Sequence, residues 1–375
     1  MTLTEARRTF LNALKFGWLI IFLPIVVRII YNIITTTSPT PTDPEQSTFD
    51  ALFGKLPALV IENTEILPST PTFKLDLIDA TFPTADPIVK IYPILSAPYG
   101  FLSRDRATNL AGRLSFTNEP QVLEDTTLIW RDITRTLTMN PSNLNFTYSF
   151  DYTSDLSIFK PGNFGSDQFA LNTANDIMGR LGIISEQRGL DLQGGNKEPT
   201  RLRYDGTSLV QASTLSQTSA LRVDYFRQPI EEIDIVSPQF YLSSVMITIS
   251  SVGNRPQENY YPQIIGLDYI YWEINRNRSA TYPIMTAEQA YSLLQQNFSR
   301  YITYLGEKEN PLTTYDSTEV STIIIKEASL GYYDTAVYQQ YLQPVWVFIG
   351  TAALDIGRTV DFVTYVPAIQ SEWIQ

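Results

Sequence analysis

Few residues of this chain have the types and spacing that catalysis requires. The nearest pattern is "SIFK", in which a helical turn would place Lys160 beside a nucleophilic Ser157. Pro161 and Gly162 follow directly and argue against a continuing helix. The companion Ser-Asp-Asn and Lys-Thr-Gly motifs are absent from the sequence. We therefore expect no serine–lysine catalysis.

Histidine and cysteine are missing from all 375 residues. This composition excludes Ser-His-Asp triads, thiolate nucleophiles, disulfides and zinc sites built from Cys and His. An enzyme would have to use Asp, Glu, Ser, Thr, Lys or Tyr, and the sequence contains no Gly-rich phosphate-binding loop. The sequence thus predicts a non-enzymatic protein with no catalytic, cofactor-binding or metal-binding residues.

Carboxylates occur in two clusters that could bind Ca²⁺ or act as an acid–base pair. The first cluster comprises Glu231, Glu232 and Asp234. The second comprises Asp76, Asp79 and Asp86. Neither has the glycine-turned ligand spacing of a calcium loop, so we interpret both as solvated surface charge. A carboxylate-dependent hydrolase acting on glycan or peptide remains the alternative.

Tyrosine is abundant, with 22 residues, several of them in pairs. Aromatic clusters on loops can bind peptides or glycans, whereas tyrosines in sheets are ordinary half-buried strand residues. Most of the pairs fit strands. Tyr332, Tyr333 and Tyr338 are different because Gly331 and Asp334 indicate a turn there. These three tyrosines are the predicted interaction surface.

The N-terminal region predicts a membrane anchor. Residues 16–35 are long enough as a helix to span about 30 Å, the thickness of a bilayer core. Trp18 and Arg28 are the predicted anchor residues, and Arg28, the single charge in the span, is expected to snorkel toward the headgroups. The lipid bilayer is therefore an expected partner through 16–35.

The charge distribution predicts the orientation of the chain in the membrane and the absence of a nucleic-acid partner. Three basic residues precede the span, namely Arg7, Arg8 and Lys15. They predict a single-pass protein with a cytoplasmic N-terminus and extracytoplasmic domains after the helix. The net charge of −12 should repel nucleic acid, so no nucleic-acid partner is expected.

The chain divides into five predicted segments. They are a cytoplasmic tail at 1–15, the transmembrane helix at 16–35, a Thr/Pro-rich stalk at 36–56, an N-terminal α+β region with two helix–strand units at 57–230, and a C-terminal α+β domain at 231–375.

Three amphipathic helices are predicted, at 103–116, 166–183 and 285–298. Ser103 is a plausible N-cap of the first helix, and Gly182 offers a stop for the second. Thr286 and Gln289 form a capping-box pattern at the start of the third.

Strands are predicted between and after these helices. The segments "TRTLTM" and "NFTYSFD" flank "NPSN" and read as a hairpin. Near the end of the chain, Val345 to Ile349 are five uninterrupted apolar residues, which predict a central strand buried beneath a helix with Pro344 as its first residue. The predicted fold class is α+β: one N-terminal transmembrane helix followed by extracytoplasmic domains of helices packed on antiparallel sheets.

Residues 282–369 resemble PepSY-type modules and, more broadly, the YycH- and YycI-like extracytoplasmic regulators of a cell-wall sensor kinase. The resemblance rests on "TAEQA" at the helix start, on Leu330–Tyr332 and on Pro344–Trp346. It implies a membrane anchor of one N-terminal helix, helix-on-antiparallel-sheet domains and no catalytic residues. It transfers no functional residue, because its matched positions are structural.

These features predict a non-enzymatic, membrane-anchored cell-envelope protein whose ectodomain regulates or binds another envelope protein. Two alternatives stay open, namely the carboxylate-dependent hydrolase and a structural assembly component of the envelope.

Overall fold

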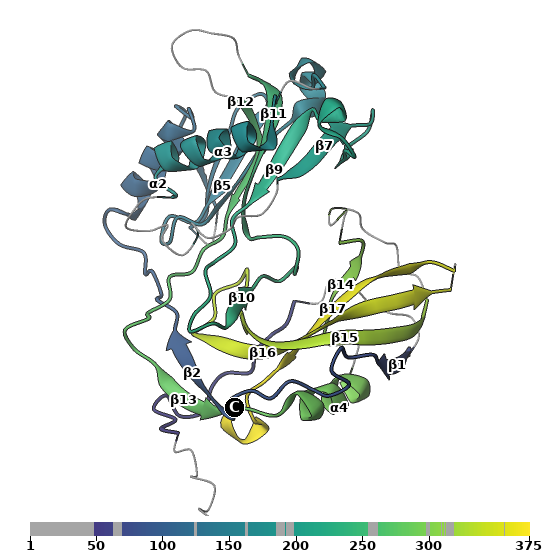
Figure 1. The fold of residues 1–375 in the computed structure, drawn as a ribbon. Coiled ribbons are helices and arrows are strands. Elements are labelled where there is room, and N and C mark those ends of the chain that lie inside the picture. The colour runs from purple at the N-terminus through teal and green to yellow at the C-terminus, as the bar shows by residue number, and fades with distance from the viewer. Residues whose placement is uncertain are drawn as a thin grey trace, which may run out of the picture. The chain divides into compact units, whose positions relative to one another are not determined.

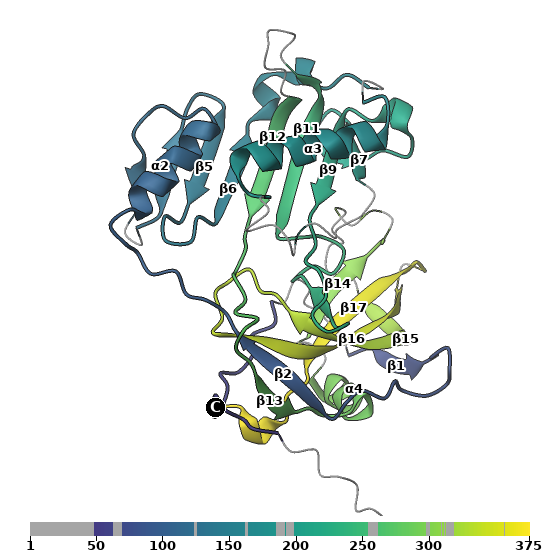
Figure 2. The same cartoon turned by 60° about the vertical axis from the view of Figure 1, so that its left-hand side comes forward.

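The computed structural model describes residues 49–62, 70–123, 126–161, 164–184, 192, 199–253, 262–297, 301–308, 310, 312, 319–355 and 357–375. Residues 49–375 form one compact unit by their internal contacts. The described part contains two β-sheets and three α-helices (Figures 1 and 2). The helices are α2 (Ser103–Arg113), α3 (Asp167–Leu181) and α4 (Ala287–Asn297).

The first sheet is antiparallel and has nine strands in the order β3-β4-β5-β6-β12-β11-β9-β7-β8. The strands are β3 (Gln121–Val122), β4 (Leu128–Arg131), β5 (Arg135–Met139), β6 (Phe146–Phe150), β7 (Thr200–Tyr204), β8 (Leu209–Gln211), β9 (Ala220–Asp224), β11 (Val245–Gly253) and β12 (Pro262–Tyr269). Helices α2 and α3 cover one face of this sheet (Figures 1 and 2). Leu110 of α2 and Ile177 of α3 pack there with Trp130 and Ile247 in one hydrophobic cluster.

The predicted hairpin is confirmed as β5 and β6. The two strands pair from Arg135 opposite Phe150 to Met139 opposite Phe146, with the connecting turn closed by the bond from Asn140 N to Asn145 O at 2.8 Å. The alternation is also as expected, because Phe146 and Tyr148 are buried whereas Thr147 between them is exposed.

The second sheet has eight strands, five of them in the order β1-β15-β16-β17-β14. Strand β10 also pairs with β15, β2 pairs with β16, and β13 pairs with β2. The strands are β1 (Thr72–Leu75), β2 (Ile88–Pro93), β10 (Asp234–Val236), β13 (Ala280–Pro283), β14 (Ile302–Gly306), β15 (Val320–Tyr333), β16 (Tyr341–Leu354) and β17 (Thr359–Pro367). Strands β1 and β10 run parallel to β15, and the remaining pairs are antiparallel.

Strand β16 explains the uninterrupted apolar run, because both of its faces are buried. Trp346 and Phe348 belong to the large cluster that includes α4, where Tyr291 meets the Phe348 ring edge to face. Val345 and Val347 belong to a second cluster on the opposite face. The central, helix-covered strand is therefore confirmed.

The start of that strand was predicted wrongly. Strand β16 begins at Tyr341, and Pro344 is a paired position inside it, opposite Tyr332 of β15. Proline lacks an N–H donor but keeps its carbonyl, which here accepts a hydrogen bond from Ala368 N at 3.0 Å.

The helix ends match the sequence signals at two helices and differ at the third. Gly182 ends α3 with a left-handed φ of 75°, which favours glycine. At α4, Thr286 N donates to Gln289 Oε1 at 2.9 Å and Gln289 N donates to Thr286 Oγ1 at 3.2 Å, which confirms the capping box. Ser103 is not an N-cap: its hydroxyl accepts from Gly100 N instead, and Leu102 occupies the cap position.

The predicted fold class is corrected by the structure, in which strands dominate the described part. The β-branched and aromatic segments extend further than expected, and both β15 and β16 reach 14 residues. Helices α2, α3 and α4 have 11, 15 and 11 residues, below the roughly 20 needed to cross a bilayer. No helix within the described residues is long and apolar enough to do so.

The predictions of a single-pass membrane protein and of extracytoplasmic domains are therefore not retained. The predicted span 16–35, with its anchor residues Trp18 and Arg28, and the tail 1–15 lie outside the described residues.

The predicted segment boundaries also change. Leu56 of the predicted stalk 36–56 is fully buried, and Phe53 stacks on Tyr341 with ring centroids 5.0 Å apart, so this part of the stalk packs against the core of the second sheet. The part of the stalk before residue 49 is not described. The boundary at 230 does not separate the sheets, because β11 and β12 return to the first sheet whereas β1 and β2 belong to the second.

Candidate functional site

Two of the three predicted interaction tyrosines lie in the core. Tyr332 and Tyr333 are 1% and 0% exposed, so they cannot form a surface, and that prediction is wrong. The Tyr332 hydroxyl donates to Lys90 O at 2.7 Å, and the Tyr333 hydroxyl accepts from Glu62 N at 3.1 Å. Burial raises the pKa of both phenols. The turn begins later than expected, because β15 continues through Gly331 to Tyr333 and the connection to β16 starts at Asp334.

Tyr338 is the one predicted interaction tyrosine that reaches the surface, with 39% of its area exposed. Its ring meets Trp272 edge to face with centroids 5.3 Å apart, and its hydroxyl donates to Ile94 O at 3.3 Å. It therefore lies beside the segments that join the two sheets.

The residues with possible catalytic spacing are not brought together. The Ser157 hydroxyl donates a hydrogen bond to Asp155 Oδ1 at 2.6 Å. The short helix η2 (Leu156–Ile158) ends before Lys160. The first acidic cluster is exposed, and its Glu231 forms an ion pair with Lys90. The second acidic cluster, Asp76, Asp79 and Asp86, is exposed as well. The described residues contain no group of three or more acidic side chains that could hold a metal ion.

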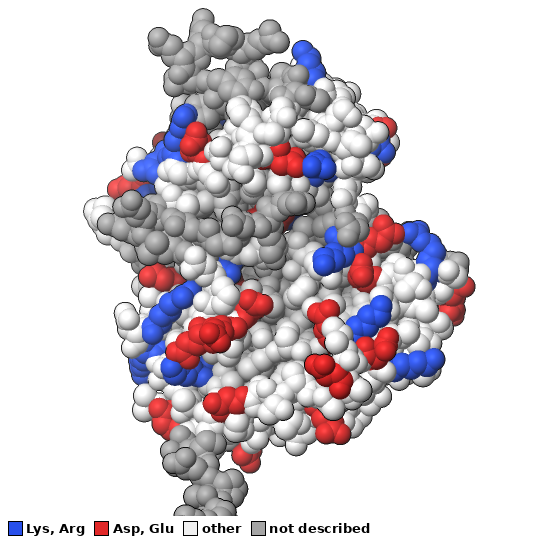
Figure 3. All heavy atoms as spheres, viewed as in Figure 1, with Lys and Arg blue, Asp and Glu red and all other residues white. Residues whose placement is uncertain are grey.

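Charged side chains of both signs are interspersed over the face drawn in Figure 3. That face shows no continuous basic patch among the described residues. It gives no electrostatic footprint of the kind that nucleic-acid binding requires.

Two carboxylates lie on the face of the first sheet opposite α2 and α3. Asp224 of β9 and Asp268 of β12 both pair with Met246 of the strand between them. Arg222 donates to both carboxylate oxygens of Asp224 at 2.8 and 2.9 Å, and Ser243 N donates to the same carboxylate at 2.8 Å. Asp224 is thus committed to local hydrogen bonds, and we interpret this pair as structural.

Asp268 should make stability depend on pH. Burial raises its pKa, and this outweighs the opposing hydrogen bond with Thr147. Because the native pKa lies above that of the unfolded chain, wild-type stability falls as pH rises through the interval between the two. We expect Asp268→Asn to raise the melting temperature at pH 7 and to lose most of this advantage near about pH 3, where the carboxyl is mostly protonated in both states.

Thermal unfolding of both proteins from pH 3 to 8 measures this effect. Asp205→Asn is the matched control and should change stability in the opposite direction at pH 7. Hydrogen bonds from the backbone N–H groups of Ser208 and Thr207 lower the Asp205 pKa to about 2. An Asp268→Asn advantage that does not change with pH would contradict the assignment.

The segments that join the sheets surround a hollow of about 280 Å³, which we call the connector hollow. Its lining residues are Leu95, Ser96, Ala97, Arg106, Ser142, Asn143, Leu144, Tyr269, Tyr271, Trp272 and Glu273. Asn145 directly follows the lining residues Ser142–Leu144. Its Oδ1 accepts a hydrogen bond from Tyr271 N at 3.1 Å, which holds one wall in place. A second tie links Leu95 N to Glu273 O at 2.8 Å.

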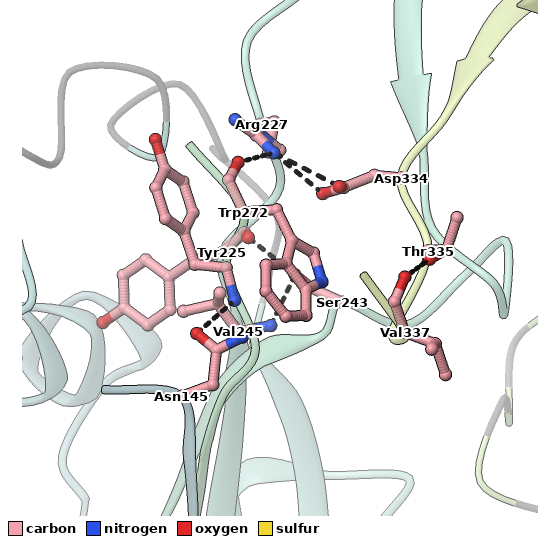
Figure 4. A network of polar contacts seen from close by, with 10 residues as sticks. Asn145, Tyr225, Arg227, Ser243, Val245, Trp272, Asp334, Thr335 and Val337 are labelled. Atoms are coloured by element: carbon pink, nitrogen blue, oxygen red, sulfur yellow. Dashed lines mark hydrogen bonds and ion pairs between the residues drawn. The ribbon is translucent and has the colours of Figure 1, made fainter. Parts of the chain in front are cut away.

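Buried polar contacts support the connector hollow (Figure 4). Arg227 donates to Trp272 O at 2.9 Å and to both carboxylate oxygens of Asp334 at 3.2 Å, and its guanidinium lies 4.6 Å from the Tyr271 ring centroid. The Arg227 and Asp334 side chains are only 5% and 13% exposed. This network fixes the backbone of Tyr271 and Trp272 at the hollow.

Two N–H groups beside the connector hollow lack an acceptor in the described part. Trp272 Nε1 and Asn145 Nδ2 are both buried, and no described group accepts from either. Buried donors are normally paired, and leaving one unpaired costs about 1–3 kcal/mol. These two donors therefore favour a ligand that brings acceptor oxygens.

The segment that leads from the lining residues Leu95–Ala97 to α2 carries large apolar side chains in solvent. Phe101 is 97% exposed, Leu102 is 58% exposed and Tyr99 is 55% exposed, all in the segment between Leu95 and α2. We call these three residues the apolar rim. Single exposed apolar residues are ordinary, but adjacent ones mark interaction sites.

A second hollow, of about 560 Å³, lies at the other end of the first sheet and is called the outer hollow here. Its lining residues are Leu156, Phe159, Pro161, Arg203, Tyr204, Gln211, Ser213, Ser216, Gln217 and Ser219.

Sequence reasoning missed both hollows. The apolar rim had a readable signal, because "PYGFLS" places three large apolar residues between Pro98 and a helix start with a glycine among them. The hollows themselves had none, since each is lined by segments far apart in the chain.

No family model matches this chain, and no curated protein matches it. A solved structure that is similar belongs to an uncharacterized protein from Eubacterium rectale ATCC 33656, with 11% identity and a TM-score of 0.33. The match covers 78% of this chain and 87% of that one. A likeness this low carries no argument about function.

Proposed function

We propose that this chain is a non-enzymatic binding protein that recognises a partner protein through the apolar rim and the connector hollow. The observation that carries the proposal is the exposure of Tyr99, Phe101 and Leu102 side by side in the sequence. Fully burying one such side chain contributes about 1.5–3 kcal/mol, so a partner that covers all three gains substantial affinity.

The adjoining hollow supplies directional contacts. Arg106, Ser142 and Asn143 line it and can donate hydrogen bonds, and Trp272 forms part of its wall. Arginine and tryptophan are enriched among the residues that dominate binding energy at interfaces. The fitting partner segment carries apolar side chains for the rim and a group with acceptor oxygens, such as a carboxylate, for the hollow.

The resemblance of 282–369 to YycH- and YycI-like regulators supports the same role and remains a prediction. The assembly alternative differs in one respect: the partner would be a second copy of this chain.

Photocrosslinking in the cells that produce the protein tests the proposal. A benzoylphenylalanine at Phe101 should give a discrete adduct with one other protein. The matched control is the same residue at Phe169, which is 53% exposed on α3. An adduct of two copies of this chain would support the assembly alternative and overturn binding to a different partner. Identical products from both positions would overturn the proposed surface.

The captured protein, once purified, allows an affinity measurement. Phe101→Ser combined with Leu102→Ser should raise the dissociation constant at least about tenfold, because truncating interface residues of this kind costs more than about 1 kcal/mol each. Ile133→Ser is the control, since Ile133 is fully exposed in the turn between β4 and β5. An unchanged affinity in the double variant would contradict the proposed surface.

A further inference from the structure

The outer hollow lies on the opposite face of the first sheet from α2 and α3. In β9, Leu221 packs in the cluster with those helices, whereas Ala220 packs with Ile158 and Leu202 below the outer hollow. The walls come from the segment after β6 and from β7, β8 and the short helix η3 (Leu215–Gln217). The site is therefore built within one sheet and is separate from the apolar rim.

One wall of the outer hollow is a fixed aromatic surface. The rings of Phe159 and Tyr204 stack with centroids 5.3 Å apart and planes 11° from parallel. Tyr152 meets both rings edge to face, at 5.6 and 6.0 Å. The Tyr204 hydroxyl donates to Gly206 O at 2.8 Å, which leaves the ring little freedom to turn. This wall is ordered before any ligand arrives, so binding to it loses little side-chain entropy.

The facing lining is polar and almost uncharged. Among its described residues only Arg203 carries a charge, and the others include three serines and two glutamines. Gln211 Oε1 is buried and accepts no hydrogen bond from any described group. This oxygen therefore calls for a ligand with a donor, and the serines can both donate and accept.

We infer that the outer hollow binds a pyranose ring of a neutral glycan. The C–H face of a pyranose is apolar and electropositive and suits the negative face of an aromatic ring. Its hydroxyl groups supply the donor for Gln211 Oε1 and acceptors for Arg203 and the serines. The volume of about 560 Å³ lies within the range of about 300–1,000 Å³ found for ligand sites.

Other ligand classes fit less well. A nucleotide could stack on the same rings, but its phosphates would meet one arginine and no α-helix N-terminus among the lining residues. An anionic sugar would likewise have a single cation to pair with. A neutral ring uses the aromatic wall and the polar wall together.

Titration calorimetry of the full chain with maltotriose, cellotriose and tri-N-acetylchitotriose tests this inference. We expect at least one of these probes to bind with a dissociation constant in the millimolar range or tighter. Tyr204→Ala should weaken that binding about tenfold, and Gln211→Leu about fivefold, through loss of the ring and of the acceptor. Binding of none of the three probes at about 10 mM would overturn the inference.

Two further variants separate binding from folding. Tyr204→Phe keeps the ring and should bind within about twofold of wild type. Phe169→Ala removes an exposed ring from α3 on the other face of the sheet and should bind as wild type. Equal affinity of wild type and Tyr204→Ala, with both proteins folded by their melting curves, would place the sugar elsewhere and overturn the assignment.

Discussion

Replacing Gly350 with alanine should lower the free energy of unfolding by more than about 3 kcal/mol. A Cβ at this position would lie 1.9 Å from Ile324 O and 3.0 Å from Ile325 Cα. These are backbone atoms of the neighbouring strand β15, so no side-chain rotation can relieve the overlap. The pairing of β15 with β16, at the centre of the second sheet, would have to shift.

Urea unfolding followed by far-UV circular dichroism measures the loss. Gly112→Ala is the matched control, because nothing lies within 4 Å of a Cβ there and the residue is inside α2. Alanine is favoured over glycine in a helix by up to about 1 kcal/mol, so the same substitution should stabilise at Gly112. A Gly350→Ala protein as stable as wild type would show that the two strands do not approach each other as described.

The second large effect is expected at the buried ion pair of Arg227 and Asp334. Asp334→Ala should cost about 3–5 kcal/mol, because it leaves the Arg227 guanidinium buried without its carboxylate. Arg227→Ala should cost a similar amount and also remove the contacts to Trp272 O and the Tyr271 ring. Both losses are measured by urea unfolding.

A double variant and a surface pair control this prediction. Arg227→Met combined with Asp334→Leu removes both charges, so its loss should be clearly smaller than the sum of the two single losses. Glu119→Ala breaks the exposed pair with Arg104, whose side chains are 91% and 50% exposed, and should cost less than about 1 kcal/mol. Additive losses at Arg227 and Asp334 would mean that the two charges act independently.

Local features of the fold could be predicted from the sequence, because the interactions that produce them are short-range. The β5–β6 hairpin, the capping box at α4 and the glycine stop at Gly182 each depend on residues a few positions apart. The buried strand at Val345–Ile349 was also predictable, since continuous apolar residues require cover on both faces.

The pairing between distant segments could not be predicted. Nothing local shows that β1 pairs with β15 across about 250 residues, or that β11 returns to the first sheet after β10 has paired in the second. The error at Tyr332 and Tyr333 has the same origin. In the sequence, Gly331 suggests a turn. In the structure it lies within β15, where Val236 of β10 and Val347 of β16 approach it closely.

The two hollows could not be predicted from the sequence, for a related reason. The connector hollow requires Ser96, Asn143 and Trp272 to meet, and the outer hollow requires Phe159 to stack on Tyr204. Each encounter is set by sheet order rather than by spacing along the chain. What the sequence offered was residue type: the exposed aromatic and apolar residues at 99–102, and the polar residues around Gln211.

The order of strands along the chain has a consequence for synthesis on the ribosome. Strands β1 and β2 emerge first, but their partners in the second sheet, β13, β15 and β16, are made only after residue 279. The strands β3 to β9 of the first sheet, together with α2 and α3, are complete some 55 residues before that point. The first sheet can therefore begin to assemble while β1 and β2 are still unpaired edges that invite aggregation. In a nascent chain, β1 and β2 therefore stay without their full set of partners until β16, the last of those partners, has been made.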